Sequence, residues 1–201
     1  MKNIFKILTA LFAVVFLASC GDGGGSSSED SFPTIETSFP PFNETPNTTM
    51  RTITYWNVAQ ADATSFINRI LQKSFQATSP SNYNHDNLIH NGILYTAFAH
   101  VYNTPRNGFQ IGATIHNSYG DIDANLLNEI YGNINGDIFS TTLVKSFVDD
   151  KTTACNNYAT ELVDNWGFTC TGTSCTKITN NYIFGWDAVL GKSISWDIHT
   201  K

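Results

Sequence analysis

Histidines and a nearby aspartate are the first residues in this sequence whose types could do chemistry. His85 and His90 lie beside Asp86, and His100 follows ten residues after His90. Zinc ligands on one helix usually stand four residues apart, whereas in a helix over 86–102 these two histidines are five apart and His100 lies about 15 Å further along the axis. We therefore expect helix-start polar groups and a hydrogen-bonded core histidine here, and neither a metal nor another cofactor.

A second group of polar residues alternates along the chain at Asp121, Asp123 and Asn125. Calcium loops of the EF-hand type begin with this alternation, but they also require Gly at position 6 and Glu at position 12. Leu126 and Gly132 stand at those two places. Capping of the following helix explains the acidic residues without a metal.

The same region supports one enzymatic alternative. His116 ends a predicted strand on its polar face, and Asp121 and Asp123 follow within a few residues. A general acid or base must lie within hydrogen-bond reach of the group it serves. A hydrolase site assembled from these scattered residues therefore requires His116 to open into a pocket beside Asp121.

Aromatic side chains offer a third kind of chemistry, which is stacking against a sugar or another flat ligand. Trp186 and Trp196 belong to runs of apolar residues at period two, over 182–186 and 194–198, and Trp56 lies in a strand-like segment. A buried sheet face is the ordinary explanation of such runs. Any of the three that is exposed is a candidate binding residue.

Apolar periodicity and turn residues predict the elements that must position these side chains. Four helices are expected, from a cap at Asp62, over 86–102, over 122–131 with Gly132 as its stop, and over 142–164 with a break near Asp149-Asp150. Turn residues at Pro105–Gly108 precede the second of six strands, which are expected over 52–58, 109–116, 168–170, 175–179, 182–186 and 193–198.

The last four strands have connections too short for crossovers, which favours antiparallel pairing. We therefore expect an α+β fold, with helices packed on one face of a mostly antiparallel sheet. One domain over 51–201 is the natural count, because a chain of that size buries enough surface for a single core. The Gly-, Ser- and Pro-rich stretch that ends at residue 50 is expected to be a flexible tether.

The N-terminus has the pattern of an export signal. Lys2 and Lys6 precede an apolar run over 7–18, which is too short to span a bilayer. The sequence Leu-Ala-Ser-Cys at 17–20 resembles the lipobox of bacterial lipoproteins. The resemblance covers residues 1–20 only, and it implies cleavage before Cys20 and acylation of its thiol.

That resemblance also implies a location. A multiply acylated Cys20 would hold the mature chain stably in a lipid bilayer. In lipoproteins of the enteric type, Asp directly after the cysteine favours the inner membrane, but here Gly21 holds that place and the Asp is at 22. The expectation is a cell-envelope protein, lipid-anchored at the outer membrane.

Export exposes the remaining cysteines to an oxidising compartment. Cys170 and Cys175 flank a four-residue connection that suits a hairpin, and a bridge between them would stabilise the fold by about 2 kcal/mol. Cys155 lies on an apolar helical stripe, so it is either a buried thiol or a rival partner for one of the other two. No activated Cys-His pair is indicated.

Composition narrows the function classes. A net charge of -6 and a pI near 5.2 provide no cationic surface for nucleic acid. No nucleophile, base or metal cluster stands at usable spacing. We expect a non-catalytic binding domain for an envelope protein or a glycan, and the hydrolase at His116, Asp121 and Asp123 is the alternative.

Overall fold

The computed structural model describes residues 32–104 and 108–201. Contacts divide the chain between Ser31 and Phe32, so that Phe32–Lys201 forms one compact unit. The signal peptide and the acylated cysteine that the sequence predicts lie outside the described residues. Among the residues that are described, no helix combines the length and the apolar character needed to cross a bilayer.

Strands dominate this unit. Its elements in chain order are α1 (Ile35–Ser38), β1 (Thr48–Val58), α2 (Gln60–Gln72), β2 (Gln76–Ser79), β3 (Asn82–His90), β4 (Ile93–Thr104), β5 (Gly108–Asn117), α3 (Ala124–Tyr131), β6 (Asp137–Ser146), α4 (Thr152–Trp166), β7 (Thr169–Thr171), β8 (Ser174–Ile178), β9 (Tyr182–Val189) and β10 (Ser193–Thr200). The mostly antiparallel sheet agrees with the expected α+β class at this coarse level, although the sheet is larger than expected.

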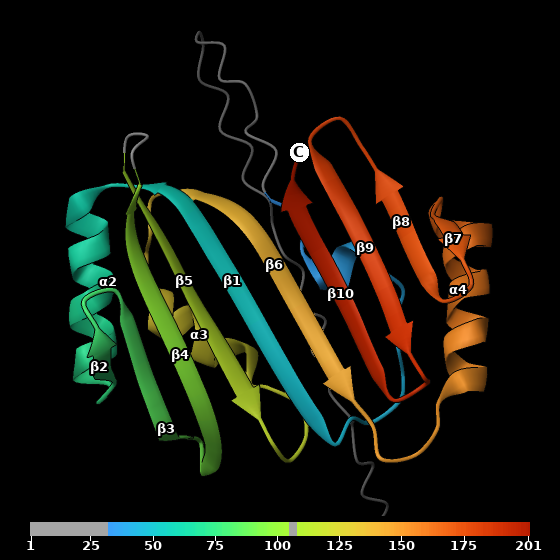
Figure 1. Ribbon diagram of the computed structural model, residues 1–201, viewed down its shortest axis with the longest axis horizontal. Helices are drawn as coiled ribbons and strands as arrows, with labels where there is room; N and C mark the ends of the chain where they lie inside the picture. The colour runs from blue at the N-terminus through green and yellow to red at the C-terminus, as the bar shows by residue number, and fades with distance from the viewer. Residues whose placement is uncertain (1–31, 105–107) are drawn as a thin grey trace, which may run out of the picture. The chain divides into compact units, whose positions relative to one another are not determined.

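Within residues 32–104 and 108–201 the strands form one ten-stranded sheet in the order β2-β3-β4-β5-β1-β6-β10-β9-β8-β7. Figure 1 shows β1 near the middle, between β5 and β6. It is antiparallel to both neighbours, and α3 carries the chain from β5 across to β6. In the described sheet, the strands of the first half, β2 to β5, and of the second half, β6 to β10, are therefore hydrogen-bonded to each other only through β1.

The helix predicted over 86–102 is wrong. This segment forms β3 and β4, an antiparallel hairpin that turns at Asn91 and Gly92. Both turn residues have positive φ, 49° and 78°, which is the backbone of a type I′ turn and which Asn-Gly adopts at low cost. The side chains of β4 that point into the core are Tyr95, Ala97, Ala99 and Val101.

The helix predicted over 142–164 is wrong over 142–151. β6 continues to Ser146, and α4 begins only at Thr152. The expected break is confirmed at this point, where a carboxylate oxygen of Asp150 accepts a hydrogen bond from the Thr152 amide at 2.7 Å.

The helix expected to start at Asp62 begins slightly earlier. It follows Ala59, and Asp62 lies within its first turn. The helix over 122–131 is confirmed in substance, since Asp123 caps α3 and Gly132 ends it. The six predicted strands are present as β1, β5 and β7 to β10.

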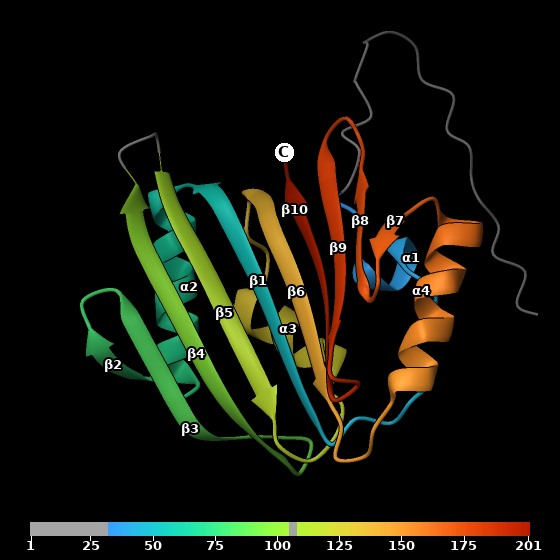
Figure 2. The ribbon, with the colours of Figure 1, turned by 45° about the vertical axis from the view of Figure 1, so that its right-hand side comes forward.

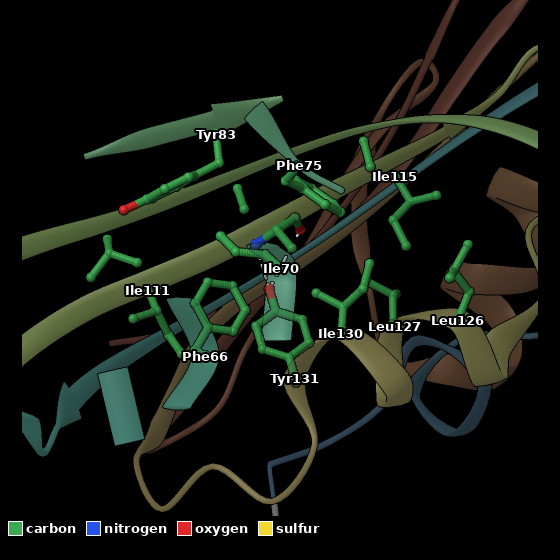
Figure 3. Packing of buried hydrophobic residues seen from close by; sticks show 14 of the residues in the cluster. Phe66, Ile70, Phe75, Tyr83, Ile111, Ile115, Leu126, Leu127, Ile130 and Tyr131 are labelled. Atoms are coloured by element: carbon green, nitrogen blue, oxygen red, sulfur yellow. Dashed lines mark hydrogen bonds between the residues drawn. The ribbon is translucent and has the colours of Figure 1, made fainter. Parts of the chain in front are cut away.

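A first hydrophobic core lies between the first half of the sheet, β1, α2 and α3. Figure 3 shows Phe66 and Ile70 of α2 beside Tyr131 of α3. The Tyr131 hydroxyl is fully buried, and it donates to the carbonyl of Ile53 and accepts from the amide of Ala113. Burial raises the pKa of Tyr131, so this hydroxyl stays a neutral link between α3 and two central strands.

A second hydrophobic core lies under β8, β9 and β10, with α4 and the segment that contains α1. Trp186 and Trp196 are both buried in it. The indole Nε1 of Trp196 donates to the Tyr158 hydroxyl at 2.9 Å, and this hydroxyl donates to the carbonyl of Pro40 at 2.8 Å. Figure 2 shows α1 and α4 beside this half of the sheet.

The segment after residue 31 is not the flexible tether that its composition predicts. Ile35 and Phe39 are buried in the second core, and Phe42 packs against Phe147, Tyr158 and Trp196. The domain boundary expected at 51 is therefore too late, and the folded unit begins at Phe32. We call residues 32–47 the strap. It contains many prolines, but it is part of the folded unit because the aromatic residues between them pack in the second core.

The cysteine pairing agrees with the hairpin prediction. Cys170 and Cys175 face each other in β7 and β8 and are joined by a disulfide. Cys155 is a buried free thiol in α4, and burial raises its pKa. The bridge closes the short hairpin at one edge of the sheet.

The buried strap gives a direct test of the corrected boundary. Phe39→Ala removes a buried ring from the second core, so we expect a loss of about 3–5 kcal/mol in unfolding free energy. Phe98→Ala is the matched control, since Phe98 is 44% exposed and its loss should cost less than about 1 kcal/mol. Urea denaturation followed by circular dichroism measures both. If Phe39→Ala were as stable as the unchanged protein, residues 32–50 would not be part of the folded unit and the original tether prediction would stand.

Candidate functional site

One face of the sheet carries no helix in the described part of the chain. Figure 1 looks onto this face, and Figure 2 shows α2, α3 and α1 on the opposite side. Because side chains alternate along a strand, each strand sends every second residue to the helix-free face. Thr52 of β1 and Thr114 of β5 point there together, with their hydroxyls 2.9 Å apart.

Aromatic rings gather at one end of the helix-free face. We call the following five residues the aromatic patch: Trp56, Phe98, His100, Tyr102 and Phe139. Trp56, Phe98 and Tyr102 are 43%, 44% and 41% exposed. Its members come from β4, β1 and β6, and β5 lies between β4 and β1. The four adjacent strands, with a spacing of about 4.8 Å, span about 15 Å.

Trp56 points to the helix-free face by the ordinary alternation of β1, and a bulge follows it at Asn57. Asn57 has a positive φ of 54°, and the register between β1 and β5 shifts between Tyr55 and Val58. The indole of Trp56 then stacks on Phe139 of β6, with ring centroids 4.1 Å apart and planes 5° apart. The extra residue of the bulge returns Val58 to the first core after Trp56.

A chain of contacts fixes the other half of the patch. The His100 ring lies over Gly112, where any Cβ atom would clash with it, and it stacks on Tyr102 at 4.9 Å. Gln110 lies 3.5 Å from the ring through its side-chain nitrogen, and the Tyr102 hydroxyl donates to Asn82 at 3.0 Å. Glycine at 112 is therefore required to hold His100 flat against the sheet.

The surface of β4 and β5 under this patch is neutral, whereas the exposed Asp137 of β6 pairs with Trp56 of β1. β4 and β5 contain no Asp, Glu, Lys or Arg. Burial lowers the pKa of His100 below its ordinary value of 6.5, so its ring is neutral near pH 7. The charged part of the same face lies on β10, where His199 and Asp197 are 3.4 Å apart.

The three candidate tryptophans have different positions. Trp186 and Trp196 are buried in the second core, so their period-two runs form the core face of β9 and β10 and neither ring can receive a ligand. Only Trp56 of the three is exposed. The patch residues on β4 were not anticipated, because a helix was expected over 86–102. The alternation of Phe98, His100 and Tyr102 is the sequence signal that could have identified them.

The structure separates the residues of the hydrolase alternative. His116 pairs with Met50 and points to the helix-free face, whereas the neighbouring β1 residue, Thr49, donates to Asp121 at 3.2 Å on the other side of the sheet. Asp123 caps α3 by accepting from the Asn125 amide at 2.9 Å. His116 and Asp121 therefore share no pocket.

The other histidines also lie apart. His90 contacts Asp123 at 3.2 Å, His85 packs edge-on against Phe75, and His100 is in the aromatic patch. Within the described residues, no three or more His, Cys, Asp or Glu side chains are grouped so that they could hold a metal ion. The hydrogen bonds that lower the pKa of Asp123 come first from the Asn125 amide and then from Asn91, as expected of a helix cap.

Comparison with known proteins adds no functional information. No protein-family model matches the chain, and no curated protein is significantly similar to it. The function must therefore be inferred from the geometry of the described residues.

The covered His100 ring makes stability depend on pH. Its pKa is lowered in the folded state, so below about pH 6.5 the unfolded chain binds more protons and the folded state loses stability. We expect His100→Gln to lose less stability than the unchanged protein between about pH 7.5 and about pH 5. Urea denaturation at both pH values measures this, with His116→Gln on the adjacent strand as the control. An equal loss in His100→Gln would contradict it.

Proposed function

We propose that this protein is a bacterial envelope lipoprotein, anchored through an acylated Cys20, that binds a neutral glycan through the aromatic patch without catalysing a reaction. The observation that carries the proposal is the patch itself, a set of exposed rings on a helix-free sheet face. An envelope protein is the other partner class, and the experiment below distinguishes the two.

The chemistry of the patch suits a sugar. A sugar ring has an apolar C–H face that stacks on aromatic rings and hydroxyls that need hydrogen-bond partners. Trp56, Phe98 and Tyr102 offer the rings, and the amides of Asn82 and Gln110 lie beside them. A charged partner would lose hydration against β4 and β5 without gaining an opposite charge, which is costly. A neutral ligand avoids that cost.

The folded unit would sit close to the membrane. Only residues 21–31 separate Cys20 from Phe32, where the compact unit begins. A chain of that length reaches at most about 40 Å. The ligand is therefore expected within the envelope layer next to the anchoring bilayer.

The anchor is tested by substituting the cysteine of the lipobox-like sequence. Cys20→Ala removes the thiol that would be acylated, so we expect loss of label when cells are fed an alkyne palmitate analogue. Cys155→Ala is the control and should keep the label, because Cys155 is buried in the fold. Unchanged labelling of Cys20→Ala would overturn the lipoprotein part of the proposal.

The binding surface is tested with variants of the patch. In the chain from residue 20 onward, carrying Cys20→Ser, each of Trp56→Ala, Phe98→Ala and Tyr102→Ala should weaken glycan binding by about 2 kcal/mol, or a factor of 30. Affinity electrophoresis in gels that contain dextran, mannan, xyloglucan or alginate provides the measurement. The three neutral polysaccharides test the ligand class, and alginate is the acidic comparison.

Tyr119→Ala is the matched control, because Tyr119 is 87% exposed and lies outside the patch. His116→Ala should also leave binding unchanged. Stronger retardation by alginate than by every neutral polysaccharide would contradict the ligand class. If no polysaccharide retards the protein and an envelope protein is captured in a way that depends on Trp56, the glycan proposal is wrong and the partner is a protein.

A further inference from the structure

A cleft of about 460 Å³ opens on the opposite, helix-bearing side of the sheet. Its floor is formed by β1 and β6 between the two hydrophobic cores, with Arg51 and Leu143 paired across the two strands. One wall is the start of α3 with the residues before it, and the other is the strap around α1. The lining residues are Thr34, Glu36, Thr49, Arg51, Ile53, Asp121, Ile122, Leu127, Asn128, Leu143 and Lys145.

Two ion pairs cross this cleft, one to each wall. Arg51 donates from Nη1 to Glu36 at 2.7 Å, and Lys145 lies 3.0 Å from Asp121 through its Nζ. The side chains of Arg51 and Lys145 are only 16% and 17% exposed, whereas those of Glu36 and Asp121 are 64% and 60% exposed. The deep charge of the cleft is therefore positive, and the negative charge lies at its mouth.

The deep cations keep unused hydrogen-bond donors. Arg51 Nε is buried and has no hydrogen-bond partner among the described residues, although a guanidinium carries five N–H donors. Partial desolvation raises the pKa of Glu36, but the hydrogen bond and charge of Arg51 outweigh it and the net pKa is lowered. Glu36 is thus an ionised carboxylate, held on an exposed strap, that satisfies one donor of the guanidinium.

An apolar extension adjoins the charged floor. A second cavity of about 360 Å³ shares Glu36, Leu143 and Lys145 with the cleft, and Phe39 and Trp196 also line it. The two together fall in the size range of small-molecule sites, about 300–1,000 Å³. Convergent cations beside an apolar channel match a ligand that is charged at one end and apolar along its body.

We propose that this cleft binds a small amphipathic anion, whose carboxylate or phosphate group contacts Arg51 and Lys145 and whose apolar chain lies between Phe39 and Trp196. Glu36 and Asp121 occupy the anion positions when the ligand is absent, and the incoming group displaces them towards solvent. Arg51 can then receive a bidentate anion, which is the geometry its planar fork favours. This site is on the other face from the aromatic patch and does not depend on the glycan proposal.

Displacement makes an unusual prediction, namely that removing a carboxylate strengthens binding. Glu36→Gln weakens the competitor of the ligand and should raise affinity by about threefold to tenfold. Glu129→Gln is the matched control, because Glu129 also pairs with a cationic side chain, that of Lys73 at 2.9 Å, and its loss changes the net charge equally. Since a misfolded protein does not gain affinity, this arm is independent of any folding defect.

Removal of a cation should have the opposite effect. Arg51→Gln and Lys145→Gln are each expected to weaken binding by about tenfold or more, while Lys73→Gln leaves it unchanged. Isothermal titration calorimetry measures all variants in the chain from residue 20 onward with Cys20→Ser, a change that leaves every described residue in place. The probes are decanoate, decyl phosphate, decyl glucoside and acetate.

Tighter binding of decanoate or decyl phosphate than of decyl glucoside and acetate supports the proposal, and the preference between the two anions identifies the carboxylate or the phosphate source. Equal binding of decyl glucoside and the two anions would overturn it, since the cations would then contribute nothing. It would also be overturned if Glu36→Gln binds no more tightly than Glu129→Gln, or if Arg51→Gln binds as tightly as the unchanged chain.

Discussion

The central constraint on this fold is the position of β1. It is the first strand of the chain, yet it lies between β5 and β6 and forms hydrogen bonds with both. Without it the described strands would form two separate sheets, β2 to β5 and β6 with β7 to β10, each with its own hydrophobic core. Because β1 pairs over most of its length on both sides, it fixes the register of the two halves at once, and a one-residue slip would exchange its two faces.

The two candidate sites follow from that position. The later part of β1 belongs to the first core, but the beginning of the strand is covered by neither core. On the helix-bearing side this part holds Thr49 and Arg51, which form the floor of the cleft. On the other side no helix covers β1, so Thr52 is partly exposed and Trp56 is exposed. A polar residue such as Arg51 is tolerated in the middle of the sheet because the seam between two cores remains open to solvent and to Glu36.

Local signals in the sequence were enough for those elements whose two faces differ. β5 alternates apolar and polar residues, α3 has a cap and a glycine stop, and the Cys170–Cys175 hairpin has short spacing, so all three were predicted. β4 was missed because it is apolar on both faces, inward for the core and outward at Phe98 and Tyr102, and this imitates a buried helix. The prediction failed at the aromatic patch for the reason that makes the patch a candidate site: its exposed rings serve no core.

The strap at 32–47 was missed for a different reason. Its prolines and polar residues have no periodicity, and its few aromatic residues are buried only because a core formed by distant parts of the chain receives them. That core is completed by β8 to β10 and α4, more than a hundred residues later, so no local window contains the signal. The strap also forms a wall of the cleft through Glu36.

Trp56 and the patch lie on the opposite face of the same central strand. Coupling between two sites requires an element that can adopt two arrangements. β1 is hydrogen-bonded on both edges, so it has little freedom to shift between two arrangements. A ligand in the cleft should therefore change the strap without changing the aromatic patch, and the two surfaces should bind independently.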